Sequence, residues 1–194
     1  METKDTKWKI LESEYLVKRP WLTARRDKVL LEDGRINDEY YVLEYPDWVN
    51  VIAITKDGKF IMERQYRHGL GVNSTEIPCG VMEKGEEPLQ AAQRELLEET
   101  GYAGGKWTKL MTICANPGSQ NNLTHCFLAT DVEKVGEQHL DATEELTVML
   151  MDEEEVKHLL LDGKLVQALM VAPLYKGQRI FPVGMMGKHL LISG

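Results

Sequence analysis

The chain lacks long apolar runs and contains only three cysteines in 194 residues. No apolar stretch approaches the ~20 residues that a membrane-spanning helix requires. The cysteines, Cys79, Cys114 and Cys126, are odd in number and fit no metal-ligand spacing. Because the sequence also shows no signal peptide, we expect a cytoplasmic protein in a reducing compartment, without a membrane partner.

Basic residues are also scarce, since 23 Lys and Arg stand against 31 Asp and Glu and the formal net charge is −8. Such a chain is not expected to present a broad surface to nucleic acid or to an anionic membrane. If it handles phosphates, local arginines or metal ions must compensate the charge. The hydrophobic fraction of 43% suffices for a sizeable core, and the length predicts one domain, alone or with a small additional lobe.

Segments with strand composition lie on both sides of one central helix. The sequences "EDGR" at 32–35 and "KDG" at 56–58 are typical of hairpin turns. This order of elements predicts an α/β (α+β) fold, an α/β/α sandwich on a mixed sheet, after extended segments at 8–45. The expected strands cover 40–45, 48–55, 59–67, 74–80, 106–115, 124–132 and 146–151. The expected helices cover 88–99, 152–165 with a stop near Gly163, and 166–177.

The central helix, predicted at 88–99, has clear signals at both ends. Pro88 suits a first helical position, and Glu86 and Glu87 favour the positive end of the helix dipole. Gly101 suits the residue at which a helix stops. Leu89, Ala92 and Leu96 are expected to form its apolar stripe.

Three carboxylates of this helix fall within one stripe. Glu95 and Glu99 are about 40° apart around the axis, and Glu98 lies about 60° to the other side of Glu95. Like charges at this spacing destabilise a helix and require a compensating cation. Arg94 precedes Glu98 by four residues and can hold one carboxylate. Mg²⁺ takes oxygen ligands of this kind, usually together with substrate phosphates. A solvated acidic helix is the alternative interpretation.

The segment "GVMEKGEEPLQAAQRELLEETGY" at 80–102 resembles the signature of the Nudix hydrolases. Its matching residues are Gly80, Glu86, Arg94, Glu95, Leu96, Glu98, Glu99 and Gly101, while Tyr102 replaces the final aliphatic residue. A solvated acidic helix would not explain the two glycines and the arginine at their spacing. The resemblance implies an α/β/α sandwich in which a loop, a helix and a loop hold metal ions.

Carried over by position, the resemblance assigns roles to these residues. Glu95, Glu98 and Glu99 would bind Mg²⁺ or Mn²⁺, and Glu98 and Arg94 would belong to the catalytic group, with Arg94 orienting a carboxylate. Glu86 would stabilise the loop or support the metal ligands. The backbone carbonyl of Cys79 matches a position that often binds a metal.

Flanking segments resemble the ADP-ribose and nucleotide-sugar pyrophosphatase branch of that family. These are "YPDWVNVIAIT" (45–55), "RQYRHG" (64–69), "EIPCG" (76–80) and "NPGSQNN" (116–122), so that the resemblance extends over about residues 10–175. It implies a β extension at 1–47 that forms a homodimer, a hydrolase domain at 48–177 and a tail at 178–194.

Residues outside the signature have alternative interpretations. Arg67 either binds a phosphate or forms a surface salt bridge, and Glu76 either serves the site or is an exposed charge at a strand end. Trp48 either stacks on a nucleobase or packs in the core or the dimer. Arg25 and Arg26 either reach a partner subunit's ligand or are solvated, and we expect His68 and His125 to be structural.

A further acidic loop, "DATEEL" at 141–146, lies between two predicted strands. In the branch that this sequence resembles, a carboxylate at this point acts as the catalytic base or as an additional metal ligand. Glu144 is the first candidate and Glu145 the second, and an ordinary solvated loop is the alternative.

The resemblance implies Mg²⁺-dependent cleavage of the diphosphate bond of ADP-ribose or a related nucleoside diphosphate sugar, giving AMP and a sugar phosphate. The first alternative is a pyrophosphatase for GDP-mannose or another nucleotide sugar. The second, from a different functional class, is a sensor with the same fold that binds a nucleotide sugar without cleaving it. Such sensors usually lack a signature carboxylate, whereas this sequence retains them all.

Overall fold

The computed structural model describes residues 6–177, which form two compact units. The N-terminal unit comprises the chain up to Pro46 together with Cys114–Leu123, and the main unit comprises Asp47–Ile113 and the chain from Thr124 onward. The sequence prediction did not place Cys114–Leu123 with the N-terminal segment. The predicted tail at 178–194 lies outside the described residues.

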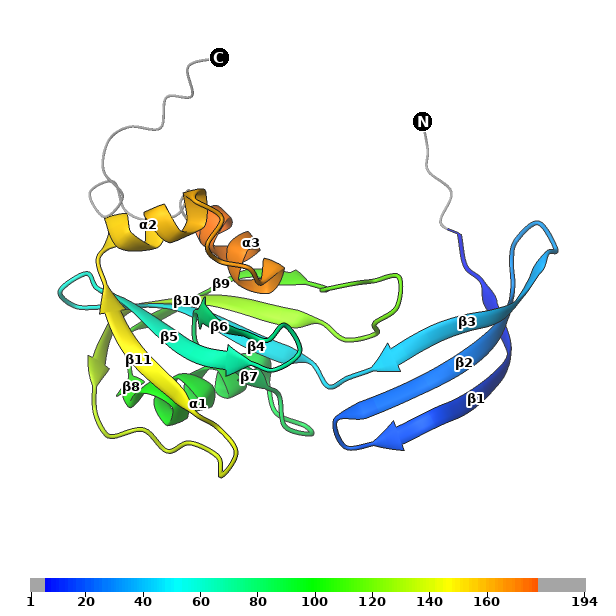
Figure 1. Ribbon diagram of the computed structural model, residues 1–194, viewed down its shortest axis with the longest axis horizontal. Helices are drawn as coiled ribbons and strands as arrows, with labels where there is room; N and C mark the ends of the chain where they lie inside the picture. Colours follow the sequence, from blue (N-terminus) through cyan, green and yellow to red (C-terminus); the bar gives the residue numbers. More distant parts are fainter. Residues whose placement is uncertain (1–5, 178–194) are drawn as a thin grey trace, which may run out of the picture. The chain divides into compact units, whose positions relative to one another are not determined.

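The N-terminal unit is an antiparallel three-stranded sheet in the order β1-β2-β3 (Figure 1). Its strands are β1 (Lys9–Arg19), β2 (Leu22–Leu30) and β3 (Ile36–Glu44). The predicted turn at 32–35 connects β2 to β3, and Gly34 adopts there the positive φ of 85° that glycine accepts without strain. The segment 114–123 attaches to β3, since the backbone N–H of Leu43 donates to Ser119 O at 2.7 Å.

The sheet of the main unit is mixed. Strands β4 and β10 pair in parallel, whereas every other strand pair is antiparallel. The central order is β11-β5-β4-β10-β8, with β6 on β5, β7 on β4 and β9 on β10. The strands are β4 (Trp48–Thr55), β5 (Phe60–Arg67), β6 (Val72–Glu76), β7 (Cys79–Val81), β8 (Tyr102–Ala103), β9 (Lys106–Ile113), β10 (Thr124–Lys134) and β11 (Leu146–Met151).

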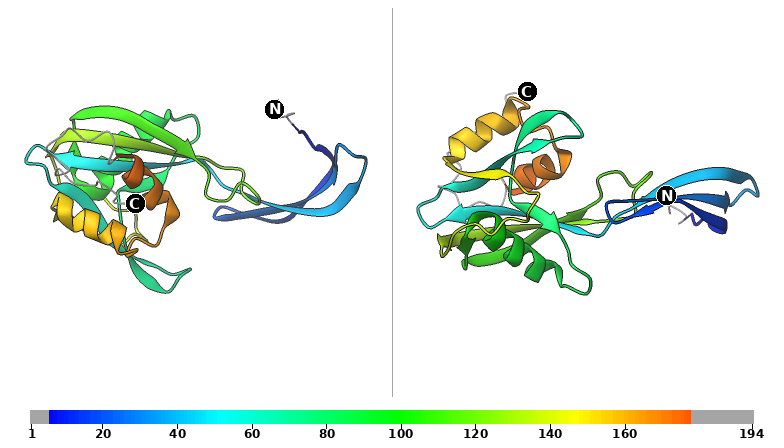
Figure 2. Two further views of the ribbon diagram at one scale, coloured as in Figure 1. Left: turned by 90° about the horizontal axis from the view of Figure 1, so that it is seen from above. Right: turned by 60° about the horizontal axis from the view of Figure 1, so that its bottom comes forward.

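Helices cover both faces of this sheet, as Figures 1 and 2 show. Helix α1 (Pro88–Thr100) packs on one face, and α2 (Glu153–Leu161) and α3 (Ala168–Gly177) lie on the other. Residues of β4 alternate between two separate cores, with Val51 on the α1 side and Ile52 on the α2 and α3 side. The predicted α/β/α sandwich on a mixed sheet is therefore confirmed.

The ends of α1 agree with the sequence signals, but one apolar assignment was wrong. Glu87 and Gln90 form a reciprocal capping box at the start, and Gly101 ends the helix with a φ of 73°. Leu89 was expected in the buried stripe, yet it is 40% exposed, while Ala91 is fully buried. Leu89 and Leu96 point in nearly the same direction, but periodicity gives only an angle and does not say which turns of a helix are covered.

Helix α2 ends close to its predicted stop at Gly163, whereas α3 begins two residues later than predicted, at Ala168. Asp152 caps α2 and shares a capping box with Glu155, and the helix ends at Leu161, two residues before Gly163. Helix α3 begins at Ala168 and contains Pro173. Among residues 6–177, no helix is both long enough and apolar enough to cross a membrane.

Candidate active site

Arg94 connects the acidic residues of α1 to the loop that precedes the helix. Its Nη1 donates to Glu95 Oε1 at 2.8 Å and to Glu98 Oε2 at 3.0 Å. Its Nε and Nη2 donate to the two oxygens of Glu86 at 3.0 and 2.9 Å, and Nη2 also donates to Val81 O at 3.0 Å. The prediction that Arg94 holds one carboxylate was therefore too modest, because it contacts three.

Glu86 stands in the loop before α1, where it binds both the helix and the loop. Besides accepting the fork of Arg94, its Oε2 accepts the backbone N–H of Glu83 at 3.0 Å. The hydrogen bonds from Arg94 lower the pKa of Glu86, so this carboxylate is charged at neutral pH. These contacts favour the loop-stabilising role that the sequence predicted for it.

Gly80 lies against the Glu95 carboxylate. A Cβ at this position would overlap the carboxylate carbon and both oxygens of Glu95. The glycine therefore allows Glu95 to pack directly against the backbone of β7. Burial raises the pKa of Glu95, and the charge of Arg94 opposes that rise.

Glu99 points inward, unlike Glu98, whose side chain is 44% exposed. The Glu99 Oε2 accepts the backbone N–H of Cys79 at 2.9 Å, so this carboxylate reaches the strand that precedes the signature loop. Burial, followed by repulsion from Glu63, raises the pKa of Glu99 to about 10. The three signature carboxylates therefore share a helix but occupy environments of different polarity.

Glu63, a residue that the sequence analysis did not single out, is buried beside Glu99. It lies in β5 and has no exposed surface. Burial first, and then repulsion from Glu76, raise its pKa to about 8. The signal available in the sequence was weak: "FIM" at 60–62 is buried on both faces, so no alternation indicated where the following glutamate would point.

Arg67 and Glu76 form a two-point ion pair near Cys79, the residue whose backbone N–H binds Glu99. Arg67 Nε and Nη2 donate to the two oxygens of Glu76 at 2.9 and 2.6 Å, and Nη2 lies 3.8 Å from Cys79 Sγ. Glu76 is 0% exposed, so the alternative of an exposed strand-end charge was wrong. Two of the three guanidinium nitrogens of Arg67 are thus committed to Glu76.

A cavity of about 280 Å³ opens beside this ion pair. Trp48, Arg67, Glu76 and Gln167 are among the residues that line it. The structure thus brings Trp48 to the same cavity as Arg67 and Glu76, although Trp48 is far from them in the sequence. The three predicted substrate-binding residues therefore share one lining.

The loop that carries Glu144 is attached to the end of α1. The His139 backbone N–H donates to Glu98 O at 2.8 Å, and Gln138 Nε2 donates to Glu99 O at 2.7 Å. Glu144 itself is exposed, and its Oε2 accepts the Asp141 backbone N–H at 3.0 Å. Its charge contributes to the raised pKa values of Glu95 and Glu99, which places it within electrostatic reach of the signature carboxylates.

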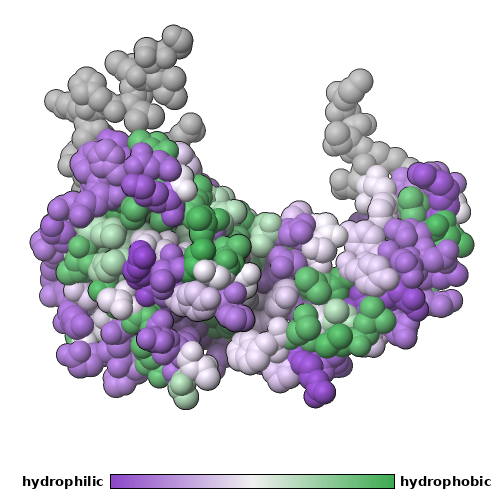
Figure 3. All heavy atoms as spheres, in the orientation of Figure 1, coloured by the Kyte–Doolittle hydropathy of each residue, from purple (hydrophilic) through white to green (hydrophobic). Residues whose placement is uncertain are grey.

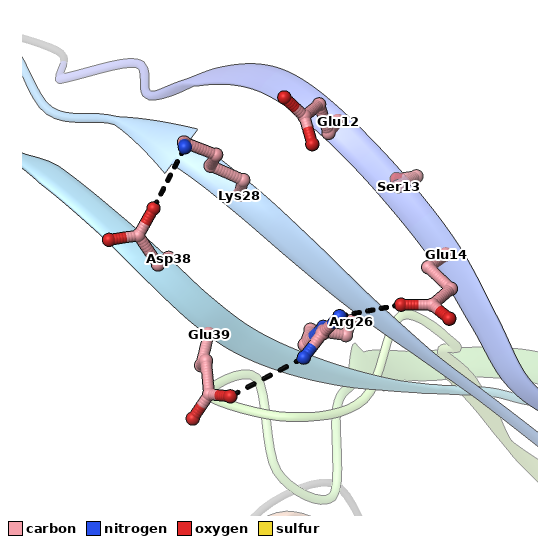
Figure 4. Close-up of a pocket in the computed structure, with 7 residues that line it drawn as sticks. All are labelled: Glu12, Ser13, Glu14, Arg26, Lys28, Asp38 and Glu39. Atoms are coloured by element: carbon pink, nitrogen blue, oxygen red, sulfur yellow. Dashed lines mark hydrogen bonds and ion pairs between the residues drawn. The ribbon is translucent and has the colours of Figure 1, made fainter.

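The remaining arginines and histidines considered from the sequence have partners within their own units. Arg26 pairs with Glu14 and Glu39 in a row of ion pairs across the N-terminal sheet (Figure 4). Arg25 pairs with Asp27 and Glu44. In the main unit, His125 Nε2 lies 3.1 Å from Asp47 and His68 packs edge-on against Tyr66. The contact of His125 agrees with the structural role expected for it, whereas His68 also lines the cavity beside Arg67 and Glu76.

The donor chemistry around α1 fits a hard divalent cation. Carboxylate oxygens from Glu95, Glu98 and Glu99 are the ligands that Mg²⁺ prefers, and Gly80 leaves no side chain between Glu95 and the neighbouring backbone. Within the described residues 6–177, no three acidic, histidine or cysteine side chains are already arranged to hold an ion. Arg94 accounts for part of this, because it draws Glu95 and Glu98 toward its own positive charge. Metal ligation by these residues and by the Cys79 carbonyl stays a prediction.

Known proteins resemble this chain in sequence and in fold. Residues 45–172 match the NUDIX domain, and residues 8–43 match the nucleoside diphosphate sugar hydrolase N-terminal domain. An ADP-ribose pyrophosphatase from Bacillus subtilis (strain 168) is 35% identical over 156 residues, which are 78% of this chain and 84% of the relative. An ADP-ribose pyrophosphatase from Mycobacterium tuberculosis is 30% identical over 164 residues, or 84% of this chain and 79% of the relative.

A crystal structure of an ADP compounds hydrolase has the same fold. It matches with a TM-score of 0.80 and 22% sequence identity, covering 92% of this chain and 96% of the other. The NUDIX match spans more than half of the chain and contains the signature residues that Arg94 brings together. The protein therefore belongs to the Nudix hydrolase family.

Proposed function

We propose that the protein hydrolyses the diphosphate bond of ADP-ribose or a related nucleoside diphosphate sugar, giving AMP or another nucleoside monophosphate and a sugar phosphate. The observation that carries this proposal is the intact acidic cluster on α1, in which Arg94 contacts Glu86, Glu95 and Glu98. The sequence relatives with this printed activity support the choice of substrate class. The proposed cofactor is Mg²⁺, with Mn²⁺ as the alternative.

Each residue around the cluster would have a separate role in the reaction. When bound, a divalent cation supplies charge neutralisation on the diphosphate and lowers the pKa of a water molecule. Glu144, with Glu145 as second candidate, would accept the proton of the attacking water, because its loop is attached to α1 and its carboxylate is exposed. Arg94 would keep Glu95 and Glu98 in place, and Arg67 would stabilise charge on the leaving phosphate.

The cavity lined by Trp48, Arg67 and Glu76 would bind part of the substrate. An indole ring beside a guanidinium offers an apolar surface for a flat or ring-shaped group and a positive charge for a phosphate. Arg67 can keep its contact with Glu76 and still present its remaining amino group to an anion. This supports a substrate that has both a ring and a diphosphate.

Two other functions remain as competing proposals. The first is cleavage of GDP-mannose or another nucleotide sugar, which a GDP-mannose pyrophosphatase of Escherichia coli supports at 32% identity over 39% of this chain. The second is a non-catalytic nucleotide-sugar sensor. No described feature favours the sensor. A sensor is expected to lack a signature carboxylate, whereas here Glu95, Glu98 and Glu99 are all present on α1, and Arg94 contacts the first two.

The test is an assay of the purified protein with Mg²⁺ against ADP-ribose, ADP-glucose, GDP-mannose, NADH and 8-oxo-dGTP, with products separated by chromatography. Glu98→Gln is the control, because it removes one proposed ligand charge while keeping the shape of the side chain. We expect AMP and ribose 5-phosphate from ADP-ribose and a large loss in the variant. If only GDP-mannose is cleaved, giving GMP, the proposed mechanism stands but the substrate is GDP-mannose instead of ADP-ribose. Tight binding of one compound without turnover would favour the sensor.

We also propose that the N-terminal sheet forms a homodimer. All eleven residues of β1 are exposed, and they include Ile10, Tyr15 and Leu16. Figure 3 shows apolar side chains at the surface of this sheet. A protein that exposes contiguous apolar surface usually covers it with a partner. Light scattering after size exclusion tests this, with Ile10→Glu/Leu16→Glu expected to be monomeric and Lys9→Glu to remain dimeric.

The proposed compartment is the cytoplasm. Cys79, Cys114 and Cys126 are all free thiols in the structure, which agrees with a reducing environment. A fluorescent fusion imaged in living cells tests this location, and a signal confined to another compartment would contradict it.

A further inference from the structure

Glu63 occupies an unusual position for a carboxylate. It lies in β5 between two neighbouring strands, with Glu76 of β6 opposite it on one side and Val148 of β11 on the other. Its side chain follows Ile61 on the face of the sheet that α1 covers, and none of its surface is exposed. A charged residue this deeply buried is found in proteins mainly when it is paired or when it binds a metal.

Apart from a protonated Glu99, no hydrogen-bond donor reaches Glu63 within the described part of the chain. Both of its side-chain oxygens are buried and have no partner. Its carboxyl group faces that of Glu99, so the two share a hydrogen bond only when one of them carries a proton.

The nearby hydrogen-bond donors are committed to other carboxylates. Arg67 donates from two nitrogens to Glu76, and the Cys79 backbone N–H donates to Glu99. Arg94 donates to Glu86, Glu95 and Glu98. The region beneath α1 therefore holds more carboxylate oxygens than donors, and the oxygens left without a donor are those of Glu63.

We propose that Glu63 is an additional carboxylate of the metal centre and that, with Glu99, it holds a divalent cation beneath α1. The inference rests on the proposed metal-dependent function, but Glu63 lies outside the helix that carries the signature. A hard cation takes several oxygen ligands, and the unpartnered oxygens of Glu63 beside the Glu99 carboxylate offer them. The metal centre would then include a ligand from strand β5 of the sheet as well as the ligands from α1.

Metal binding tests this proposal without relying on activity. Mn²⁺ is titrated by calorimetry into metal-stripped wild-type protein and into Glu63→Gln, Glu63→Asp and Glu133→Gln, and bound Mn²⁺ is counted by electron paramagnetic resonance. Glu63→Gln keeps the shape of the side chain and removes its charge. Glu133→Gln removes one charge from an exposed ion pair with Lys56, and so controls for net charge.

We expect Glu63→Gln to lose one bound ion or to bind Mn²⁺ about 10-fold to 100-fold more weakly, the range seen when groups that support metal ligands are removed. Glu63→Asp should also bind more weakly because its carboxylate is one methylene shorter, whereas Glu133→Gln should match the wild type. Circular dichroism checks that each variant is folded.

If Glu63→Gln binds as many Mn²⁺ ions as the wild type, and as tightly, the proposal is overturned. Glu63 and Glu99 would then share a proton but no metal ion. If Glu63→Gln does not fold, unchanged binding by Glu63→Asp would overturn it instead. A wild-type protein that binds no Mn²⁺ would contradict the proposed metal site as a whole. The two failures are therefore distinguishable.

Discussion

The Arg94 guanidinium and the Glu86 carboxylate form a two-point ion pair, with Nε 3.0 Å from Oε1 and Nη2 2.9 Å from Oε2. Glu86 precedes α1 and Arg94 lies in its second turn, so the pair connects the loop to the helix that carries the acidic cluster. The same guanidinium contacts Glu95 and Glu98, which makes it the common support of the proposed metal ligands.

Replacing Arg94 by lysine should therefore reduce kcat/KM by about 100-fold, a loss comparable to that on removing a group that orients metal ligands. Lysine keeps the charge but cannot donate to three carboxylates in the planar geometry of a guanidinium. Steady-state kinetics measures the effect, and Arg26→Lys, in exposed ion pairs of the other unit, is the control. Wild-type activity in Arg94→Lys would contradict the supporting role.

Gly80→Ala should displace Glu95, because the added methyl group would overlap its carboxylate. We expect weaker Mg²⁺ dependence of activity, seen as a higher metal concentration for half-maximal rate, together with about 1–3 kcal/mol lower stability from overpacking. Gly136→Ala is a matched control, since no atom lies within 4 Å of the position of its added Cβ. Equal behaviour of the two variants would show that the contact with Glu95 is unimportant.

The Arg67–Glu76 pair should behave as a buried ion pair. Arg67→Met leaves the Glu76 carboxylate buried without a partner and should destabilise the protein by about 3 kcal/mol. The double variant Arg67→Met/Glu76→Met should recover most of that loss, because neither charge then remains buried. Urea denaturation measures both values. Additive losses in the double variant would indicate that the two residues do not interact.

Glu144→Gln should lower kcat with little change in KM if this residue accepts the proton of the attacking water. Its neighbour Glu145 lies in the same loop, so Glu145→Gln is the matched control. A larger loss in Glu145→Gln would exchange the roles of the two residues.

The contribution of Glu63 to the stability of the metal-free protein should decrease as the pH rises from about 4.5 to about 8. Burial raises the folded-state pKa of Glu63 to about 8, so the folded state keeps its proton over a range in which the unfolded state has released it. This contribution is fully present below the unfolded pKa and is lost on passing through the folded pKa.

Denaturation midpoints with a chelator, measured over this range, should show a shallower decline in Glu63→Gln than in the wild type. Comparing the two proteins removes the contributions of carboxylates distant from Glu63, such as Glu86, whose lowered pKa acts in the opposite direction. Glu99 changes together with Glu63, because repulsion from Glu63 contributes to the raised pKa of Glu99, and this makes the expected difference larger. Parallel pH profiles would contradict the raised pKa of Glu63.

The sequence alone determined the family, the layers of the fold and the acidic stripe on α1, because each depends on local spacing. Hairpin turns at Gly34 and Gly58, the capping of α1 and the direction of Glu95, Glu98 and Glu99 all follow from residues close together in the chain. The exposure of Leu89 did not follow, since it depends on where neighbouring elements end.

Only the tertiary structure showed the burial of Glu63 against Glu99 and of Glu76 against Arg67. Glu63 and Glu99 are 36 positions apart and meet because α1 packs on the sheet that contains β5. Spacing along a chain gives the direction of a side chain on its own element, whereas desolvation depends on what covers it. The acidic stripe was therefore predictable, but the buried carboxylate that we propose to complete it was not.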